Sequence, residues 1–314
     1  MTRLPGAVPG IARICVVGAG LMGWQIGLMC ARAGYVVHQF DINPDALANA
    51  RQRQRATLDE WNASGKLGLL EATGEPTDVV ADRIRQFTSL DEACQGVQMA
   101  IEAVTERIET KRQIFTELDR LTPPSVILAT NSSSIQSRRL ANAVTHPERL
   151  CNFHFTNHPW LRPYVETMTC GQTRPDILET CYRIGNSLGI ASARVHGESQ
   201  GFIHNYVWRQ IKKAAMTLVD RGHSSVEDVD RAVMIGLRAP LGPFQMMDRA
   251  GLDVMLDIER QWFAESGEER DRPPKVLEDL VAHGNLGVKT GHGFYSYPNP
   301  SFERPGWLLG QEEE

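Results

Sequence analysis

The chain has 314 residues, of which 42% are hydrophobic and 23% charged, a composition typical of a globular protein with about two domains. A formal net charge of −5, with no dense stripe of lysine and arginine, disfavours a nucleic-acid partner. The six cysteines show no CxxC spacing, which favours free thiols in a reducing, cytoplasmic setting over a disulfide framework.

One uncharged run near the N-terminus has almost the length of a membrane helix. Residues 14–31, ICVVGAGLMGWQIGLMCA, carry no charge between Arg13 and Arg32. The run contains four glycines and Gln25, and the strand-like YVVHQFD follows it directly. We therefore expect a strand, a turn and a helix here, and neither a membrane span nor a signal peptide.

The first two hundred residues alternate strand-like and helix-like segments. Short β-rich apolar runs predict strands, and helical periodicity with capping residues predicts the helices between them. The expected strands cover residues 13–20, 35–41, 97–104, 125–134 and 150–156, and the clearest helices cover 21–34 and 43–65. Asn43 is the expected N-cap of the second helix, with Pro44 at its first position. Such alternation predicts an α/β fold, with a Rossmann-type, mostly parallel sheet covered by helices on both faces.

Beyond residue 200 the pattern is helical, with no convincing strand. The helix-like segments are residues 199–222, 225–236 and 252–266. We expect two domains, a Rossmann domain over residues 1–200 and an all-helical C-terminal domain over 201–314. The last stretch, residues 301–314, is expected to be a loosely held tail.

A G-x-G-x-x-G motif lies at the junction of the first strand and the first helix. Alone it is a weak signal, but here Asp41 closes the next strand eighteen residues after Gly23, as a dinucleotide site requires. Gly18 would allow the tight turn, Gly20 the approach of a pyrophosphate, and Gly23 close packing of the helix. A carboxylate at Asp41 would bind ribose hydroxyls and repel a 2′-phosphate, which favours NAD over NADP. The expected cofactor contacts are Gly18, Ala19, Gly20, Leu21, Met22, Gly23 and Asp41.

The segment FHFTNHPWLRPYVETM, residues 153–168, holds the chief candidates for acid–base chemistry. His154 and Glu166 are twelve residues apart in a strand–turn–strand pattern, so their side chains can meet. A carboxylate bonded to one imidazole nitrogen fixes the tautomer and raises the basicity of the other, which suits removal of a hydroxyl proton. From spacing alone, a buried histidine with an unrelated surface glutamate fits equally well. His158 completes a His-x-x-x-His spacing, but Pro159 argues against the helix that a zinc pair needs, so no metal is expected.

A serine cluster, residues 132–134, follows the apolar run SVILA, residues 125–129. Side chains at the carboxyl end of a parallel strand lie where open α/β sheets bind ligands. Capping of the next helix explains at least one of these serines equally well. The chain has no G-x-S-x-G motif, which disfavours a serine hydrolase.

Taken together, these motifs resemble the 3-hydroxyacyl-CoA dehydrogenase family over nearly the whole chain. VVGAGLMG resembles its nucleotide loop, IEAVTERIETKRQIF its V-x-E-x-x-x-x-K segment, ATNSSSI its N-T-S-S-L, HFTN its H-F-F-N and YVE its L-V-E. GFIHN resembles its G-F-I-V-N, PLGPFQMMDRAGLD its helical-domain signature, and LGVKTGHGFY its closing G-K-K-T-G-x-G-F-Y. Each motif alone is modest, but the set in this order and spacing is specific.

The resemblance implies roles for individual residues. His154 matches the family's catalytic base and Glu166 its partner. Ser133 matches a serine that contacts substrate oxygen and nicotinamide, and Asn205 an asparagine that orients the reacting carbonyl. Four further positions match residues that line the cofactor or close over it, namely Glu106, Lys111, Asn157 and Lys289. The implied reaction moves a hydride from C3 of a 3-hydroxyacyl-CoA to NAD, and the family's helical domain implies a homodimer.

Several positions depart from the family's pattern. Trp24 and Gln25 replace small residues, His158 replaces a proline, and Arg162 stands where an apolar residue is common. Three cations interrupt a helix that is usually apolar: Arg209, Lys212 and Lys213. Because a buried unpaired charge is costly, these cations need solvent or an anion. A solvated or dimer-facing helix side explains them, and so does a pocket for a polar or anionic hydroxy acid, with Arg162 as a further substrate contact.

Three hypotheses for function follow. The leading one is an NAD-dependent dehydrogenase of short-chain 3-hydroxyacyl-CoA, which would belong to fatty acid metabolism. The enzymatic alternative is a dehydrogenase of a free polar 3-hydroxy acid, such as a sugar-acid or carnitine-like substrate. A nucleotide-binding protein without turnover is the third hypothesis, and the intact set His154, Glu166, Ser133 and Asn205 argues against it.

Overall fold

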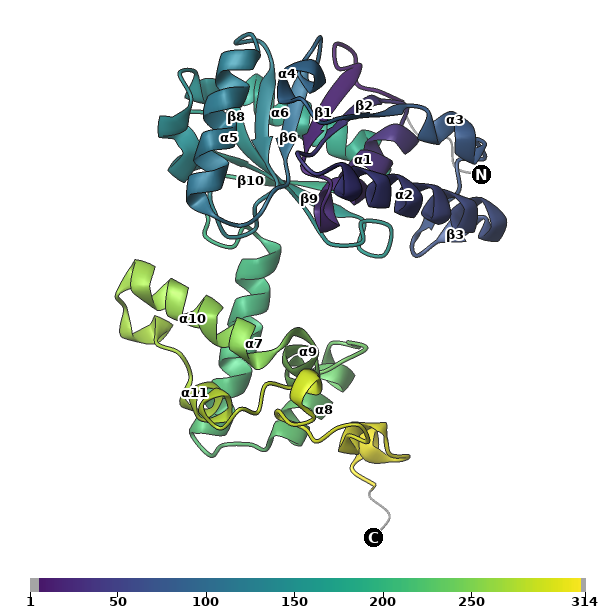
Figure 1. Ribbon diagram of the computed structural model, residues 1–314. Helices are drawn as coiled ribbons and strands as arrows, with labels where there is room; N and C mark the ends of the chain where they lie inside the picture. The colour runs from purple at the N-terminus through teal and green to yellow at the C-terminus, as the bar shows by residue number, and fades with distance from the viewer. Residues whose placement is uncertain (1–5, 312–314) are drawn as a thin grey trace. The chain divides into compact units, whose positions relative to one another are not determined.

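The computed structural model describes residues 6–311 of the chain. The chain divides into two compact units, Met1–Ile203 and His204–Glu314, close to the boundary expected at residue 200. The first unit holds a sheet with helices, and the second is helical (Figure 1). This architecture confirms the predicted fold class, a Rossmann-type sheet followed by a helical domain. In the part of the chain that the structure describes, no helix has the length and apolar character needed to cross a bilayer.

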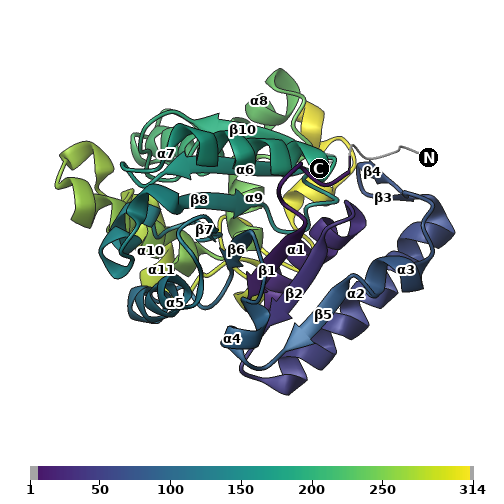
Figure 2. The same ribbon diagram turned by 90° about the horizontal axis from the view of Figure 1, so that it is seen from above.

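An eight-stranded sheet forms the centre of the N-terminal unit, with strand order β10-β9-β8-β7-β6-β1-β2-β5 (Figure 2). The strands are β1 (Arg13–Val17), β2 (Val36–Phe40), β5 (Ile84–Phe87), β6 (Met99–Glu102), β7 (Ile127–Thr130), β8 (Leu150–Phe155), β9 (Tyr164–Thr169) and β10 (Ala191–Val195). Neighbouring strands are parallel except β8 and β9, which pair antiparallel. The strand order reverses between β1 and β6, so the carboxyl ends of these two strands flank the crevice where such sheets bind ligands.

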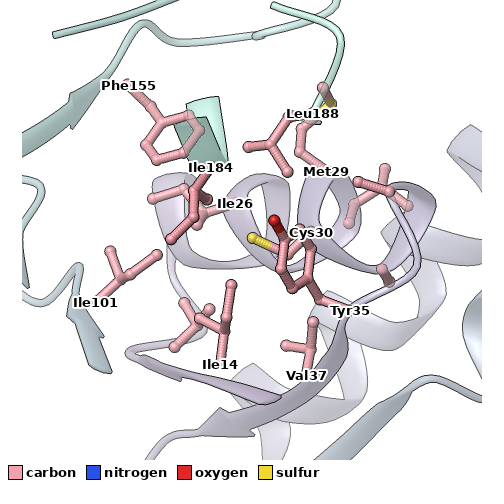
Figure 3. Close-up of a cluster of buried hydrophobic side chains, with 14 of the residues drawn as sticks. Ile14, Ile26, Met29, Cys30, Tyr35, Val37, Ile101, Phe155, Ile184 and Leu188 are labelled. Atoms are coloured by element: carbon pink, nitrogen blue, oxygen red, sulfur yellow. The ribbon is translucent and has the colours of Figure 1, made fainter. Parts of the chain in front are cut away.

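Helices cover both faces of this sheet. One face packs against α1 (Leu21–Arg32), α2 (Pro44–Ser64), α3 (Thr77–Ala81) and α6 (Pro175–Ser187). The other face packs against α4 (Leu90–Ala93) and α5 (Ile108–Leu121). Because successive strand residues point to opposite faces, Ile14 joins the first apolar cluster and Cys15 the second. Figure 3 shows Ile26 and Met29 of α1 packed between strand residues and Ile184 of α6.

The second helix begins where the sequence predicts. The Asn43 side chain accepts a hydrogen bond from the backbone N–H of Asp45, Pro44 occupies the first turn, and Gly65 ends the helix in the left-handed conformation. A small antiparallel hairpin follows, formed by β3 (Lys66–Leu67) and β4 (Leu70–Glu71), which the sequence did not indicate.

Five α-helices make up the described part of the C-terminal unit: α7 (His204–Asp220), α8 (Val226–Gly236), α9 (Pro243–Ala250), α10 (Leu252–Ser266) and α11 (Lys275–Ala282). Their apolar faces meet in one core around Phe244 and Leu256. Two buried carboxylates also hold this unit together. Asp230 accepts hydrogen bonds from the first turn of α9, and Asp248 accepts bonds from the backbone of Phe294 and Tyr295.

The expectation of a loose tail over residues 301–314 is wrong for its first part. Trp307 is 1% exposed and belongs to the helical core. Its ring packs edge-on against Phe302, and the Arg231 guanidinium lies 4.6 Å from its centroid. An apolar indole here can bury a large area, which outweighs the entropy lost by ordering the segment. Residues 312–314 of the expected tail lie outside the described residues.

The cations of α7 are partnered inside the helical unit. Arg209 is 2% exposed, and its guanidinium donates to the carboxylates of Glu259 and Asp271. The Lys213 ammonium lies 3.1 Å from Glu259. Lys212 is buried, its Nζ is 3.1 Å from Sδ of Met255, and burial lowers its pKa. For Arg209 the interpretation as a solvated cation is therefore wrong, because its anions are internal carboxylates. Lys213 is partly buried and shares the carboxylate of Glu259.

Candidate active site

The glycine turn between β1 and α1 has a conformation that only glycine fits well. Gly18 has a φ of +107°, and a Cβ there would lie 2.7 Å from the carbonyl oxygen of Ala103, which follows β6. A Cβ on Gly23 would lie 1.9 Å from the carbonyl oxygen of Gly18. A Cβ on Gly20, in contrast, would meet nothing within 4 Å. Gly18 and Gly23 are thus required by the fold, whereas Gly20 keeps a space open above the turn.

The open space at Gly20 fits the pyrophosphate of a dinucleotide. Gly20 is the N-cap of α1 and supplies no side-chain cap, so the first N–H groups of the helix are free to bind phosphate oxygens. No acidic residue occupies the first turn of α1, where it would repel phosphate. Asp41 follows β2, and its Oδ2 accepts a hydrogen bond of 2.8 Å from the backbone N–H of Ala19. This contact places a carboxylate beside the glycine turn, as ribose binding requires.

His154 and Glu166 face each other across the antiparallel pair of β8 and β9. The two residues are directly opposed in register, and His154 Nδ1 lies 3.2 Å from Glu166 Oε2. Both are buried, at 7% and 0% exposure. The predicted contact is therefore present, and the surface-glutamate alternative is wrong. His154 is the penultimate residue of β8, so it lies at the carboxyl edge of the sheet, the same edge as the glycine turn.

The surroundings of this pair restrict the histidine ring. The imidazole stacks on Phe202, with centroids 4.8 Å apart and planes 26° from parallel. Phe202 has a φ of +57°, an uncommon conformation for a side chain of this size. Since Nδ1 faces the carboxylate, Nε2 is the nitrogen left for exchange of a proton with a ligand.

Lys111 and Glu102 form a buried ion pair between α5 and β6. Lys111 Nζ lies 2.7 Å from Glu102 Oε1, and the two side chains are 1% and 0% exposed. Glu102 also accepts hydrogen bonds from Thr130 Oγ1 and from the backbone N–H of Val104. Lys111 is therefore held inside the domain, and its expected influence on a cofactor would act through its neighbours.

Glu106 connects that ion pair to the serine cluster. Its Oε2 lies 3.1 Å from Lys111 Nζ, while Oε1 accepts hydrogen bonds from the hydroxyls of Ser132 and Ser134. Burial alone would raise the pKa of Glu106, but the Lys111 ammonium and the two serine hydroxyls outweigh it and lower that pKa. Ser132 also accepts a bond from the N–H of Ile135, within the turn that follows β7. The next helix, Ser137–Ala143, has Gln136 as its N-cap and no side-chain cap, so the capping role considered for these serines is not observed. Ser133, between them, stays exposed.

The remaining predicted residues lie in three places. Asn157 and Arg162 are exposed on the turn between β8 and β9. Asn205 is the second residue of α7, and exposed Lys289 forms an ion pair with Asp253, both in the helical unit. Their roles in binding stay predictions. Within residues 6–311, no group of three or more metal-ligating side chains is arranged to hold a metal ion.

Two residues near the site were not recognised from the sequence as part of it. Gln25 of α1 donates to Asn157 Oδ1 at 3.0 Å and accepts from the N–H of His158 at 2.7 Å, so it fixes the turn after β8. Tyr164 donates a hydrogen bond of 3.2 Å to Glu166 Oε1. The period of two in a strand was the available signal, since Tyr164 lies two positions before Glu166 on the same face. Trp24, the other unusual residue of α1, is buried against Trp160.

A doubly wound sheet, a glycine turn with an acid on the next strand, and a histidine–carboxylate pair at the same edge define a dinucleotide-dependent oxidoreductase. Comparison with known families makes this specific. The NAD-binding domain of 3-hydroxyacyl-CoA dehydrogenase matches residues 13–198, and the C-terminal domain of that enzyme matches residues 201–297. The chain belongs to the 3-hydroxyacyl-CoA dehydrogenase family: it is an NAD-dependent oxidoreductase that acts on CH–OH groups.

Individual relatives extend the comparison. The chain is 35% identical over 298 residues to a 3-hydroxybutyryl-CoA dehydrogenase of Mycobacterium tuberculosis, covering 91% of this chain and 99% of the relative. The crystal structure of (S)-3-hydroxybutyryl-CoA dehydrogenase from Ralstonia eutropha is similar, with a TM-score of 0.84, 28% identity and coverage of 92% and 100%. A 5-formyl-3-hydroxy-2-methylpyridine 4-carboxylate 5-dehydrogenase of Mesorhizobium japonicum is 29% identical over 290 residues, covering 91% of each chain.

Proposed function

We propose that this protein interconverts a short-chain 3-hydroxyacyl-CoA and its 3-oxoacyl-CoA, with His154 as the acid–base group. The observation that carries the proposal is the 3.2 Å contact of His154 Nδ1 with the buried carboxylate of Glu166, at the sheet edge that holds the glycine turn. The names of the 3-hydroxybutyryl-CoA dehydrogenase relatives support the substrate class.

The chemistry of the pair follows from its geometry. NAD, when bound, supplies the acceptor for the hydride. With Nδ1–H directed at Glu166, the free Nε2 of His154 takes the proton of the substrate hydroxyl. The carboxylate then stabilises the imidazolium that forms, and the Phe202 ring fixes the plane of the imidazole. In the reverse direction the imidazolium returns this proton to the carbonyl oxygen. We assign Ser133 and Asn205 to orientation of that oxygen.

A matched pair of histidine variants tests the proposal. We expect His154→Gln to lower kcat for reduction of acetoacetyl-CoA by about 10²- to 10⁴-fold, the usual contribution of general acid–base catalysis, while NADH still binds. His146 is the control, because it also contacts a carboxylate, with Nδ1 3.0 Å from Glu148, but both side chains are 41% exposed. His146→Gln should keep full activity. Normal turnover by His154→Gln would refute the assignment.

A free anionic hydroxy acid is the second candidate substrate, and Arg162 favours it. Among the described residues its exposed guanidinium has no hydrogen-bond or ion-pair partner, and it lies on the same turn as Asn157. The relative that acts on a pyridine carboxylate shows that the family includes a non-CoA substrate. A screen of acyl-CoA thioesters and free hydroxy acids with NAD separates the two. If an acid is turned over, Arg162→Ala should raise its KM, and an unchanged KM would exclude this contact.

We also propose that the protein is a cytoplasmic homodimer that associates through its helical unit. Exposed apolar side chains on that unit support an interface, and they are Val207, Leu218, Ile235, Leu237, Val254 and Leu309. Six buried free cysteines suit a reducing compartment. Light scattering on the purified protein tests the oligomeric state, and a monomer at micromolar concentration would contradict it.

A further inference from the structure

The two carboxylate oxygens of Glu166 contact different groups. Oε2 faces His154 Nδ1 at 3.2 Å. Oε1 accepts from the Tyr164 hydroxyl at 3.2 Å and from the backbone N–H of Ile203 at 2.9 Å. Since Glu166 is fully buried, these donors replace the water that would otherwise solvate its charge.

The Tyr164 hydroxyl is a side-chain donor to Glu166 Oε1, and Tyr164 lies two residues before Glu166 on the same strand. A leucine at this position has no donor, so the Tyr164 hydroxyl adds one hydrogen bond to the carboxylate. Burial, followed by the nearby charge of Glu166, raises the pKa of Tyr164 to about 12, which keeps the hydroxyl protonated as a donor at neutral pH.

A hydrogen-bond donor on Oε1 weakens the stabilisation that the carboxylate gives to a positive charge beside Oε2. Each hydrogen bond draws negative charge toward its own oxygen, so less remains to stabilise a protonated imidazole at the other. The pH at which His154 gains its proton should therefore fall. The imidazole then remains an available base at a lower pH than a pair without the tyrosine would allow.

The strands and the segment that adjoin the pair carry further ionisable groups. β8 contributes the buried thiol of Cys151, whose pKa is raised by its hydrogen bond to Cys181 and by burial. β10 contributes Arg194, which pairs with Glu179. The segment 199–203 has no ionisable side chain, and His204 follows it in the chain. His204 must therefore be tested beside Tyr164.

We propose that Tyr164 is a positioning residue that sets the proton affinity of the His154–Glu166 pair through its hydrogen bond to Glu166. The proposal rests on the function proposed above and adds a determinant of its working pH range. It predicts that this enzyme keeps an unprotonated base to more acidic pH than the same enzyme with an apolar residue at position 164.

The test measures the titration of His154 directly, in the full-length protein without substrate. Nitrogen-15 NMR of labelled histidine gives the midpoint, and His154→Gln identifies the resonance. We expect Tyr164→Phe to move the midpoint up by about half a pH unit to one unit, and Tyr164→Leu to do the same. Tyr182→Phe on α6 is the matched control, since its hydroxyl makes no hydrogen bond within residues 6–311. His204→Asn should leave the Tyr164→Phe shift in place.

The pH profile of kcat/KM for alcohol oxidation gives the second readout. Its acidic limb should move upward by the same amount in Tyr164→Phe, whereas a purely structural role would lower the rate at every pH without moving the limb. An unmoved or lowered His154 midpoint in both Tyr164 variants would overturn the proposal. Full activity of His154→Gln would instead overturn the proposed function, while the NMR midpoints would still show whether Tyr164 acts on the pair.

Discussion

Arg209 and Glu259 form a two-point ion pair inside the helical unit. The distance from Nε to Oε1 is 3.0 Å and that from Nη2 to Oε2 is 2.7 Å, with both side chains at most 3% exposed. Asp271 takes the remaining Nη1 at 2.8 Å, and the guanidinium lies 4.2 Å from the Trp262 centroid. Each of the three guanidinium nitrogens thus donates to a carboxylate, so Arg209 links α7, α10 and the Glu269–Asp271 turn.

Removal of the shared carboxylate should destabilise the helical unit strongly. We expect Glu259→Gln to lower the free energy of unfolding by about 3 kcal/mol or more, because a buried arginine then lacks its main counter-charge. The double variant Arg209→Met with Glu259→Leu should recover most of that loss. Urea denaturation followed by tryptophan fluorescence measures both. Arg260→Ala, whose 61%-exposed arginine lies 4.0 Å from Asp257, is the control and should change little. A double variant no more stable than Glu259→Gln would contradict the expectation.

The two glycines Gly20 and Gly23 should respond differently to alanine. Gly23→Ala places a methyl group against the Gly18 carbonyl, so it should lower the melting temperature and abolish NADH binding. Gly20→Ala meets no protein atom, so the fold should survive while the methyl group obstructs the pyrophosphate. We expect NADH affinity to fall by about tenfold or more, measured by NADH fluorescence. Unchanged affinity in Gly20→Ala would mean that the nucleotide does not approach this turn.

Asp41 should decide between the two nicotinamide cofactors. Its carboxylate lies beside the turn and accepts the N–H of Ala19. We expect Asp41→Asn to raise the Kd for NADH by about tenfold. This corresponds to the loss of roughly 1.4 kcal/mol from a hydrogen bond to a charged group. Binding of NADPH should not weaken, because the repulsion of its 2′-phosphate is removed. Kd values for both nucleotides check this, and a variant that loses both equally would refute the assigned role.

Asp230 should make the stability of the helical unit depend on pH in an unusual way. It is fully buried, accepts bonds from the N–H groups of Phe244 and Gln245 and from the Tyr295 hydroxyl, and burial raises its pKa to about 6. Because the folded state binds this proton more tightly than the unfolded state, the contribution of Asp230 is most favourable below about pH 4. As pH rises to about 6 this contribution is lost, and the free energy of unfolding falls by about 2 to 3 kcal/mol.

The variant Asp230→Asn isolates that contribution. Its destabilisation relative to the unaltered protein should be larger at pH 4.5 than at pH 7.5, because the neutral carboxyl group is the form that the fold prefers. Thermal melts of both proteins at the two pH values measure the difference. Equal destabilisation at both would show that Asp230 titrates at its ordinary value.

The sequence predicted those features that depend on neighbours along the chain or across one hairpin. The glycine turn, the Asn43 cap and the contact of His154 with Glu166 are of this kind. The sequence did not indicate the partners of Arg209, because Glu259 and Asp271 lie 50 and 62 residues away and only helix packing brings them to Arg209. Burial of Trp307 likewise depends on a core assembled from distant helices, which local composition does not reveal.

The antiparallel pairing of β8 with β9 fixes the positions of the paired side chains and leaves those on the connecting turn exposed. Backbone hydrogen bonds between the strands, together with burial, hold His154 opposite Glu166. The connecting turn has three exposed side chains, namely Asn157, Leu161 and Arg162. Mutations at those exposed sites alter the chemistry presented to an incoming molecule without shifting the register beneath. On the function proposed above, substitutions on this turn can therefore alter substrate specificity while the contact between His154 and Glu166 stays in place.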